Sequence, residues 1–379
     1  MRVYLWEYAI STHLGNILKG MAALGYKACY VVHTKTYASR ETEGWMRPDL
    51  PGVEILQPCD SNHVVNIITQ SSTDDIHICV GLRANDHVRT AAAALRANGR
   101  HFLVFMETID ERSLLTKLKR PIYRRLFMQN RPQLEGILAA GANTAAWVAA
   151  RGVPASQIFD FAYFLNAPLL VKAPSGPSPD ATLLFVGSLI ALKRVHLIID
   201  ALRSLPKKIT LDIVGDGPLR NKLEKQADAF APGRVNFHGT RPMSEIAGFM
   251  ASADCLVLPS DHDGWGAVIS EAMLAGTPVV CSDRCGASVA VRASGRGQVF
   301  ETFAPNACTQ ALRKQVSAGL VTTIDRAKLA AWAKCLAEPA GAAYLDRIIA
   351  HLRRGAPRPQ PPWEQAGQLD TSPKMERRY

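Results

Sequence analysis

Two carboxylates and a glycine-rich loop are the part of this chain best suited to chemistry. The loop at residues 263–266 (DGWG) directly precedes a helical pattern that contains Glu271. At about 3.6 residues per turn, Asp263 and Glu271 are separated by slightly more than two turns, so both could reach one ligand from the loop and the helix. The N–H groups at a helix start bind anions, which favours an anionic ligand. The alternative is structural: Asp263 caps the helix and Glu271 is solvated.

The flanking sequence predicts a strand on each side of this helix. Residues 255–258 (CLVL) form a short apolar run without alternation that ends at Pro259, which is typical of a buried parallel strand. Gly276 and Pro278 end the helix, and residues 279–281 begin the next strand. Strands and helices alternate through the whole second half, which predicts a doubly wound domain.

This pattern resembles the donor-binding motif of the family-4 retaining glycosyltransferases, the glycosyl transferases group 1, which have the GT-B fold. The family form is Glu-Gly-Phe-Gly and then, on the helix, Glu-Ala-Met/Leu-Ala-x-Gly-x-Pro-Val-Val. The residues that match in register are Gly264, Gly266, Glu271, Ala272, Met273, Ala275, Gly276, Pro278, Val279 and Val280. Asp263 departs from the family form, because it places a shorter carboxylate where the family has its first glutamate.

A basic loop after the predicted strand 182–186 carries the second part of the resemblance. Lys193 lies at the family's lysine position, Ser188 replaces a frequent arginine and Arg194 replaces a usual glycine. A lysine beside two phosphates at a helix N-terminus makes physical sense, because its charge and the helix dipole act together. The resemblance implies that Lys193 and Arg194 meet the donor diphosphate. The alternative for Lys193 is a surface position at a helix start.

The resemblance implies a retaining transferase that uses a nucleotide diphosphate sugar, with no cofactor and no metal ion, because the basic loop replaces a divalent cation. Glu271 would accept hydrogen bonds from ribose hydroxyls, and Asp263 would contact the transferred sugar. Main-chain groups near residues 238–240 would read the base. The expected catalytic residues are Asp263, Lys193, Glu271 and Glu107. The expected donor-binding residues are Gly187, Ser188, Lys193, Arg194, Gly215, Gly239, Asp263, Gly264, Trp265, Gly266, Val268 and Glu271.

The first half has the pattern of another Rossmann-type domain. Its opening elements are expected to be a strand at 2–6, a loop at 7–15, a helix at 16–24 and a strand at 28–33. His13 and Gly15 in this loop, and Arg83 after a strand at 76–80, are candidates for the acceptor side. A surface loop histidine is the alternative for His13. Glu107 ends a further strand, and its alternative role is to cap a helix.

The chain divides at a linker rich in proline, serine and glycine. Residues 173–179 (APSGPSP) mark this boundary. The expected fold is α/β, with Rossmann-like doubly wound domains at 1–172 (acceptor) and 173–340 (nucleotide sugar) that face a central cleft. The resemblance adds a helix at 341–354 that returns to the first domain. The tail at 355–379 is rich in proline and poor in apolar residues, so it is expected to be disordered.

The composition is that of a globular chain with an excess of positive charge, because 47% of the 379 residues are hydrophobic and the net charge is +11. No apolar run approaches the ~20 residues of a membrane span, and Glu7 comes too early for a signal peptide. The eight cysteines lack zinc-site spacing and are interpreted as small buried side chains in a reducing cytosol. The expected location is therefore cytoplasmic.

Basic residues gather at 112–131, which contains seven lysines and arginines, no acid, and interleaved apolar side chains. Such a helix can lie on anionic lipid, at ~1 kcal/mol per basic residue, which would place the protein at the inner face of the cytoplasmic membrane. The alternative is a solvated basic face. Nucleic acid is disfavoured as a partner, because no recognition motif accompanies the charge.

The resemblance implies transfer of a sugar to a glycan or lipid-linked acceptor, in cell-envelope or exopolysaccharide biosynthesis. Two alternatives stay open, since fold does not fix function. The first is a non-hydrolysing nucleotide-sugar epimerase of the same fold. The second is a catalytically weak scaffold or binding subunit, which the departures at Asp263 and Ser188 favour.

Overall fold

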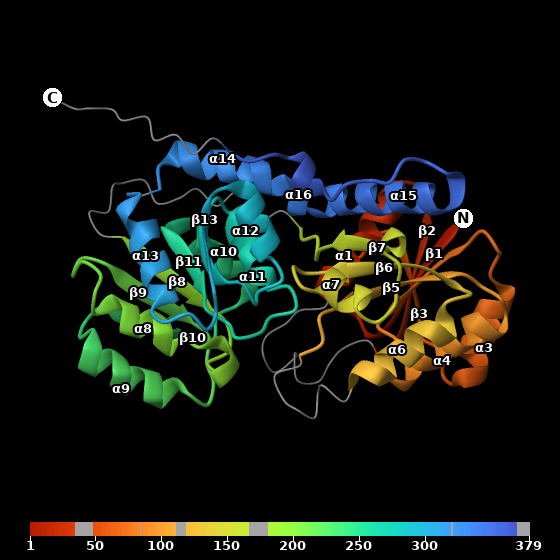
Figure 1. Ribbon diagram of the computed structural model, residues 1–379, viewed down its shortest axis with the longest axis horizontal. Helices are drawn as coiled ribbons and strands as arrows, with labels where there is room; N and C mark the ends of the chain where they lie inside the picture. The colour runs from red at the N-terminus through yellow and green to blue at the C-terminus, as the bar shows by residue number, and fades with distance from the viewer. Residues whose placement is uncertain (35–47, 84, 111–118, 167–180, 320, 370–379) are drawn as a thin grey trace. The chain divides into compact units, whose positions relative to one another are not determined.

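The computed structural model describes residues 1–34, 48–83, 85–110, 119–166, 181–319 and 321–369. These residues form two units (Figure 1). Unit 1 comprises Met1–Asn166 with Leu336–Pro362, and unit 2 comprises Ala167–Cys335 with Trp363–Tyr379. The predicted boundary between residues 172 and 173 lies outside the described residues.

Unit 1 is a parallel sheet with helices on both faces. Its elements are β1 (Arg2–Ala9), α1 (Thr12–Ala23), β2 (Lys27–Thr34), β3 (Val53–Leu56), α3 (Ser61–Gln70), β4 (Ile76–Val80), α4 (Asp86–Ala97), β5 (Phe102–Glu107), α6 (Lys119–Asn130), β6 (Leu134–Ala140), α7 (Thr144–Ala149), the 3-10 helix η1 (Ala155–Gln157), β7 (Ile158–Phe161) and α15 (Glu338–Arg354). The strand order is β3-β2-β1-β4-β5-β6-β7, and all paired strands are parallel. The chain therefore reverses its direction of winding between β1 and β4, as in a doubly wound fold.

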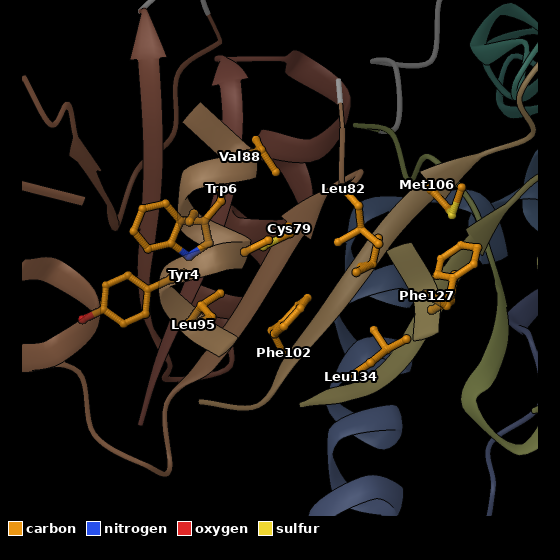
Figure 2. Close-up of a cluster of buried hydrophobic side chains, with 14 of the residues drawn as sticks. Tyr4, Trp6, Cys79, Leu82, Val88, Leu95, Phe102, Met106, Phe127 and Leu134 are labelled. Atoms are coloured by element: carbon orange, nitrogen blue, oxygen red, sulfur yellow. The ribbon is translucent and has the colours of Figure 1, made fainter. Parts of the chain in front are cut away.

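The core of unit 1 lies on both faces of this sheet. Figure 2 shows one face, where Trp6 and Cys79 from the strands meet Val88 and Leu95 from α4. Trp6 and Leu95 are fully buried. Strands buried on both faces are apolar at nearly every position. This explains why the apolar runs of the sequence locate the strands of this sheet.

The first helix corrects one prediction. The expected loop at 7–15 is wrong, because β1 continues to Ala9 and α1 begins at Thr12. Ser11 caps α1, since its hydroxyl accepts the N–H of Leu14 at 3.3 Å. His13 and Gly15 therefore lie in the first turn of α1 instead of a loop. The serine cap before Gly15 marks the helix start, so Gly15 is a helical residue.

Unit 2 repeats the doubly wound design. Its elements are β8 (Thr182–Val186), the 3-10 helix η2 (Ala191–Lys193), α8 (His196–Leu202), β9 (Thr210–Val214), α9 (Arg220–Phe230), β10 (Val235–Gly239), α10 (Met243–Ser252), β11 (Cys255–Leu258), α11 (Ala267–Leu274), β12 (Val279–Ser282), α12 (Ser288–Ser294), β13 (Gly297–Phe300), α13 (Ala307–Ser317) and α14 (Thr323–Ala333). The strand order is β10-β9-β8-β11-β12-β13, with all pairs parallel. The 3-10 helix η3 (Lys334–Leu336) leads back to unit 1.

Helix α15 belongs to unit 1 and packs against α1. It begins at Glu338, three residues before the predicted start at 341, with a proline in its first turn. A Cβ atom at Gly20 of α1 would lie 2.6 Å from the Cβ of Ala342, so the two helices approach closely. The Tyr26 hydroxyl donates to Asp346 at 2.5 Å and adds a polar contact between the segments.

The expected disorder of the tail is wrong for residues 355–369. Arg358 donates to the carbonyl of Ser156 at 2.7 Å and to that of Ile158. The short helix α16 (Pro362–Gln365) carries Trp363, which is only 4% exposed. Few apolar residues are present, but the buried Trp363 and the hydrogen bonds of the exposed Arg358 fix this segment. Residues 370–379 lie outside the described part of the chain.

Candidate functional site

The candidate site of unit 2 lies at the carboxyl edge of its sheet. The chain winds from β8 toward β10 in one direction and from β11 toward β13 in the other, so β8 and β11 flank the switch point. In doubly wound sheets, ligands bind in the crevice outside the strands at this point. The loop after β8 contains Lys193, and the loop after β11 contains Asp263. The fold therefore places both predicted residues beside the switch point.

The structure brings Lys193 and Asp263 together. The Lys193 ammonium lies 2.6 Å from an Asp263 carboxylate oxygen, and the side chains are 21% and 17% exposed. The Asp261 N–H also donates to the Leu192 carbonyl at 2.8 Å, which ties the two loops together. The pair holds the lysine in place and neutralises it while no anion is bound. Two residues that were predicted separately for the donor site thus lie in direct contact.

The loop that carries Asp263 is fastened to the loop after β12. The Asp263 N–H donates to the Arg284 carbonyl at 3.1 Å, and the Asp263 carbonyl accepts the Gly286 N–H at 3.0 Å. Trp265 is 1% exposed, and its indole N–H donates to Ser270 at 3.0 Å. The Trp265 side chain is therefore a buried anchor of the loop. Several contacts fix the backbone on which Asp263 stands.

Gly266 makes the turn from this loop into α11. Its φ of 83° lies in the left-handed region, where a residue with a Cβ is strained. An added Cβ would also lie 3.3 Å from Leu258 and 3.6 Å from the Asp263 carboxyl carbon. The start of α11, with its outward N–H groups, thus directly adjoins Asp263. This supports the predicted anion-binding role of the helix start.

Glu271 lies in the second turn of α11 and is half-buried. No hydrogen bond or ion pair of its carboxyl group is found among the described residues. Burial raises the pKa of this carboxyl from 4.5 to about 7. A half-buried acid without a protein partner is suited to accept hydrogen bonds from a ligand's hydroxyl groups.

The raised pKa of Glu271 predicts a pH-dependent stability. The folded protein keeps this proton between pH 4.5 and about 7, where the unfolded chain has lost it, so unfolding free energy falls as pH rises through this range and is flat above it. Glu271→Gln removes the effect. We expect this variant to match the wild type near pH 4.5 and to exceed its unfolding free energy by about 1–3 kcal/mol at pH 8.

Chemical denaturation of both proteins at several pH values measures this difference. Glu301→Gln, at an exposed position of the same unit, is the matched control. A constant difference between wild type and Glu271→Gln from pH 4.5 to 8 would contradict the assignment.

The predicted glycines at the ends of β8, β9 and β10 contact one another through their backbones. The Gly187 N–H donates to the Val214 carbonyl at 2.9 Å, and the Gly215 N–H donates to the Gly239 carbonyl at 2.8 Å. A Cβ at Gly215 would lie 2.0 Å from the Gly187 carbonyl oxygen. Gly187, Gly215 and Gly239 form a surface of backbone atoms beside the switch point, which we call the backbone floor. A flat ligand could approach it closely, because no side chains project from these residues.

Arg194 points away from its neighbour Lys193. It adopts the left-handed conformation, with φ 51° and ψ 36°. Its guanidinium donates to the Thr302 carbonyl, beyond the end of β13, at 2.9 Å. The expectation that Arg194 adds a second charge beside Lys193 therefore has no direct support in the geometry. Ser188 is exposed in the same loop, and Gly264 and Val268 are half-buried in the loop and first turn around Gly266.

The candidates of unit 1 lie near the carboxyl ends of its central strands. His13 packs its ring 5.2 Å from that of Tyr163, and Gly15 lies against Leu50. Arg83 is exposed after β4. Glu107 ends β5 and is in register with Ala140 of β6. These residues of unit 1 thus lie at the carboxyl ends of its strands, but they follow different strands.

Sequence reasoning missed a buried polar cluster in unit 1. The Tyr30 hydroxyl donates to the Glu7 carboxylate, and the Ser11 N–H donates to the Tyr30 oxygen at 3.0 Å. Burial and the nearby Glu7 raise the pKa of Tyr30 well above its ordinary value. The signal was present, because Glu7 is an acid inside an apolar strand. The cluster fixes the end of β1 where α1 begins.

The described residues contain no group of three or more histidines, cysteines, aspartates or glutamates arranged to hold a metal ion. Among the same residues, no helix has the length and apolar character required to cross a membrane. All eight cysteines are free thiols, and six of them are buried.

Comparison with known proteins assigns the second half of the chain to a recognisable domain type. Residues 171–330 match the family model described as glycosyl transferases group 1. The lipopolysaccharide core biosynthesis glycosyltransferase LpsE of Rhizobium meliloti is 37% identical over 109 residues, 27% of this chain and 30% of that protein. The lipopolysaccharide glucosyltransferase WaaG of Escherichia coli K12 is 33% identical over 140 residues, 36% and 37% of the two chains. The chain thus aligns with about a third of the length of these relatives.

Solved structures resemble the chain over nearly its whole length. The apo form of the lipopolysaccharide outer core galactosyltransferase WaaB has a TM-score of 0.70 at 18% identity, covering 92% of this chain and 99% of that chain. Anabaena Alr3699/HepE in complex with UDP has a TM-score of 0.69 at 17% identity, covering 92% and 100%. At such identities the likeness shows the fold. The predicted α/β fold of two Rossmann-like doubly wound domains is confirmed.

Proposed function

We propose that this chain, whose second half matches the glycosyl transferases group 1, moves a sugar from a nucleotide diphosphate sugar to a glycan or lipid-linked acceptor. The observation that carries the proposal is the Lys193–Asp263 pair at 2.6 Å, beside the left-handed Gly266 at the start of α11. A cation, a carboxylate and a helix start are thereby collected at the switch point of a doubly wound sheet. Glu271, further along α11, completes the arrangement.

A uridine diphosphate sugar is the donor we favour. Anabaena Alr3699/HepE, a structure of similar fold, was solved with UDP, and in another crystal with UDP and glucose. We propose that the nucleoside binds against the backbone floor of Gly187, Gly215 and Gly239. Glu271, once ionised, would accept hydrogen bonds from the ribose hydroxyls. The names of LpsE and WaaG point to lipopolysaccharide or another envelope polysaccharide as the product class.

Lys193 is the proposed stabiliser of the leaving group. As the bond between the sugar and the diphosphate breaks, negative charge grows on the phosphate oxygens. An ammonium already fixed by Asp263 can meet this charge with little reorganisation, so it stabilises the transition state more than the ground state. Asp263 would then contact hydroxyls of the transferred sugar. A metal ion is not required in this scheme, because Lys193 and the helix start supply the positive charge.

Retention of configuration is part of the proposal. The acceptor oxygen would bond to the anomeric carbon on the face that the diphosphate leaves, and its proton would pass to the departing phosphate oxygen. His13, Gly15, Arg83 and Glu107 of unit 1 are the residues we propose for the acceptor side. The anomeric configuration of the product, measured by NMR against that of the donor, tests this step.

A panel of UDP-, GDP- and TDP-sugars, each with and without added acceptor glycans, tests the activity. Transfer of the sugar to an acceptor is the expected result. An epimerised nucleotide sugar would favour a non-hydrolysing epimerase of the same fold instead. Thermal stabilisation by nucleotides without turnover of any donor would favour a binding subunit.

We also propose that the protein works in the cytoplasm at the inner face of the membrane, attached through α6. The inner side of α6 packs through Phe127 and through Tyr123, whose ring lies 5.1 Å from that of Trp147. Its outer side exposes arginines together with Met128 (64%) and Ile122 (41%). Basic and apolar side chains on one exposed face are suited to an anionic lipid surface. The remaining part of the predicted basic stretch, 112–118, lies outside the described residues.

Reversing two charges of α6 should weaken binding to anionic vesicles. At ~1 kcal/mol per basic residue, the Arg124→Glu/Arg125→Glu variant is expected to lose about tenfold or more in partition to phosphatidylglycerol vesicles. Sedimentation of the protein with vesicles measures this loss. The control is Lys207→Glu/Lys208→Glu, which makes the same charge change at exposed neighbours in unit 2. Equal losses in both variants would remove α6 from the contact.

A further inference from the structure

Two arginines and an exposed phenylalanine meet at the carboxyl edge of unit 2. The Arg194 guanidinium carbon lies 6.0 Å from the ring centre of Phe303, and that of Arg284 lies 5.4 Å from the same centre. Phe303 is 65% exposed, although it is a large apolar side chain. We call Arg194, Arg284 and Phe303 the arginine cluster. Arg284 and Phe303 carry no role in the reaction proposed above.

The arginine cluster stands on a rigid base. Thr302 is 3% exposed, and its N–H donates to Asp283 at 3.0 Å while its hydroxyl donates to the same oxygen. The Asp283 N–H donates in turn to the Phe300 carbonyl at 2.9 Å. The carbonyl of Thr302 is the group that holds Arg194. The loops after β8, β12 and β13 are thus tied together below the cluster.

The positive charge of the cluster is not cancelled by nearby acids. Neither Arg194 nor Arg284 takes part in an ion pair with any described residue. Asp263, in the loop after β11, is already paired with Lys193 at 2.6 Å. Asp283 is occupied by Thr302. Two guanidinium groups beside one ring therefore retain donors for an added anion.

The backbone of Arg194 is strained, which argues that its side chain has a use. Its φ of 51° is a conformation that costs a residue with a Cβ roughly 1–2 kcal/mol and that glycine adopts freely. Among the described residues, Asn306 is the only other non-glycine with a positive φ. Strain of this kind collects at functional sites, and here it aims the guanidinium at Thr302 and Phe303.

The order of the strands places the cluster next to the proposed sugar position. The carboxyl edge carries these features in the order of the strands. The backbone floor lies at β10, β9 and β8, Lys193 follows β8, Asp263 follows β11, Arg284 follows β12, and Phe303 follows β13. Arg284 directly contacts the loop after β11, because its carbonyl accepts the Asp263 N–H at 3.1 Å. A sugar held by Asp263 would therefore have the arginine cluster on the side away from the nucleoside.

We propose that the arginine cluster binds an oxyanion, a carboxylate or a phosphate, carried by a substrate sugar. The inference rests on the proposed function for the placing of that sugar, and it adds an acidic sugar as the substrate class. Guanidinium groups bind both anions with paired hydrogen bonds, and Phe303 orients the two groups while offering apolar surface to the ring of the sugar. The anion belongs either to the transferred sugar or to the acceptor.

Binding of UDP, UDP-glucose, UDP-glucuronate and glucose 6-phosphate, measured by calorimetry, tests the proposal. If the transferred sugar carries the anion, UDP-glucuronate binds more tightly than UDP-glucose, and Arg284→Gln reduces their affinity ratio about tenfold or more. Arg194→Gly should reduce it similarly and remain folded, because glycine relieves the backbone strain. Arg203→Gln is the matched control, since Arg203 lies 4.6 Å from the ring centre of another exposed phenylalanine, Phe230, over which no second arginine lies in the described part of the chain.

Each of the other possible results leads to a different conclusion about the cluster or the proposed function. Loss of glucose 6-phosphate binding in Arg284→Gln and Arg194→Gly, with no effect on the UDP-sugars, assigns the anion to the acceptor and supports the cluster. Unchanged affinities for all anionic ligands in both variants overturn the cluster, while retained binding of UDP leaves the proposed function standing. Failure of UDP and UDP-glucose to bind counts against the proposed function, and the glucose 6-phosphate measurement still decides on the cluster.

Discussion

Replacing Lys193 with alanine is expected to lower the transfer rate about 10²- to 10³-fold, the usual cost of losing one preorganised group that stabilises developing negative charge. The fold should survive with a loss of stability, because the Lys193–Asp263 pair is 21% and 17% exposed and removal of the lysine leaves a largely buried carboxylate that water still reaches. The measurement is kcat/KM with the best donor of the panel, together with thermal unfolding. A loss in kcat at constant KM would place the interaction in the transition state.

Lys19→Ala is the matched control for this prediction. Lys19 forms an ion pair with Glu338 at 3.0 Å within unit 1, where α1 meets α15. Its removal deletes a comparable pair without touching the switch point of unit 2, so the transfer rate should not change. An unchanged rate in Lys193→Ala would remove the lysine from the site. An equal loss in both variants would show a general effect on folding.

The strands and the loop at 263–266 could be predicted from the sequence. Strands that are buried on both faces of a sheet consist almost entirely of apolar residues. The strands at 76–80, 182–186 and 255–258 were found at their observed bounds for this reason. Gly266 was also identifiable, since the turn into α11 requires a positive φ that glycine supplies. Lys193 and Asp263 were each predicted as donor-site residues, but their direct ion pair is seen only in the structure, where their strands are neighbours at the switch point.

Side-chain direction could not be predicted in the same way. Lys193 and Arg194 are adjacent, yet the left-handed φ of Arg194 sends its guanidinium to Thr302 while Lys193 turns to Asp263. The arginine cluster could not be predicted from the sequence, because Arg194, Arg284 and Phe303 come from three separate loops. Trp363 was missed for a similar reason, since a single buried tryptophan fixes a segment whose average composition is that of a disordered tail.

Gly215→Ala is expected to be the most destabilising change in the site. The added Cβ would lie 2.0 Å from the Gly187 carbonyl oxygen and 2.9 Å from its carbon, both of them backbone atoms that cannot rotate away. The φ of 134° adds strain for any residue with a Cβ. We expect a loss of about 3 kcal/mol or more in unfolding free energy, with loss of UDP binding, because the backbone floor must open. Denaturant unfolding and calorimetry with UDP measure both effects.

Gly233→Ala separates the clash from the strain. Gly233 also has a positive φ, 70°, but a Cβ there meets no atom within 4 Å. Its replacement should cost only the left-handed conformation, roughly 1–2 kcal/mol, and should leave UDP binding intact. The excess loss in Gly215→Ala then measures how tightly the loops after β8 and β9 approach each other. Equal losses in the two variants would mean that these loops can move apart, and that the floor beneath the nucleoside is not fixed by the Gly215 contact.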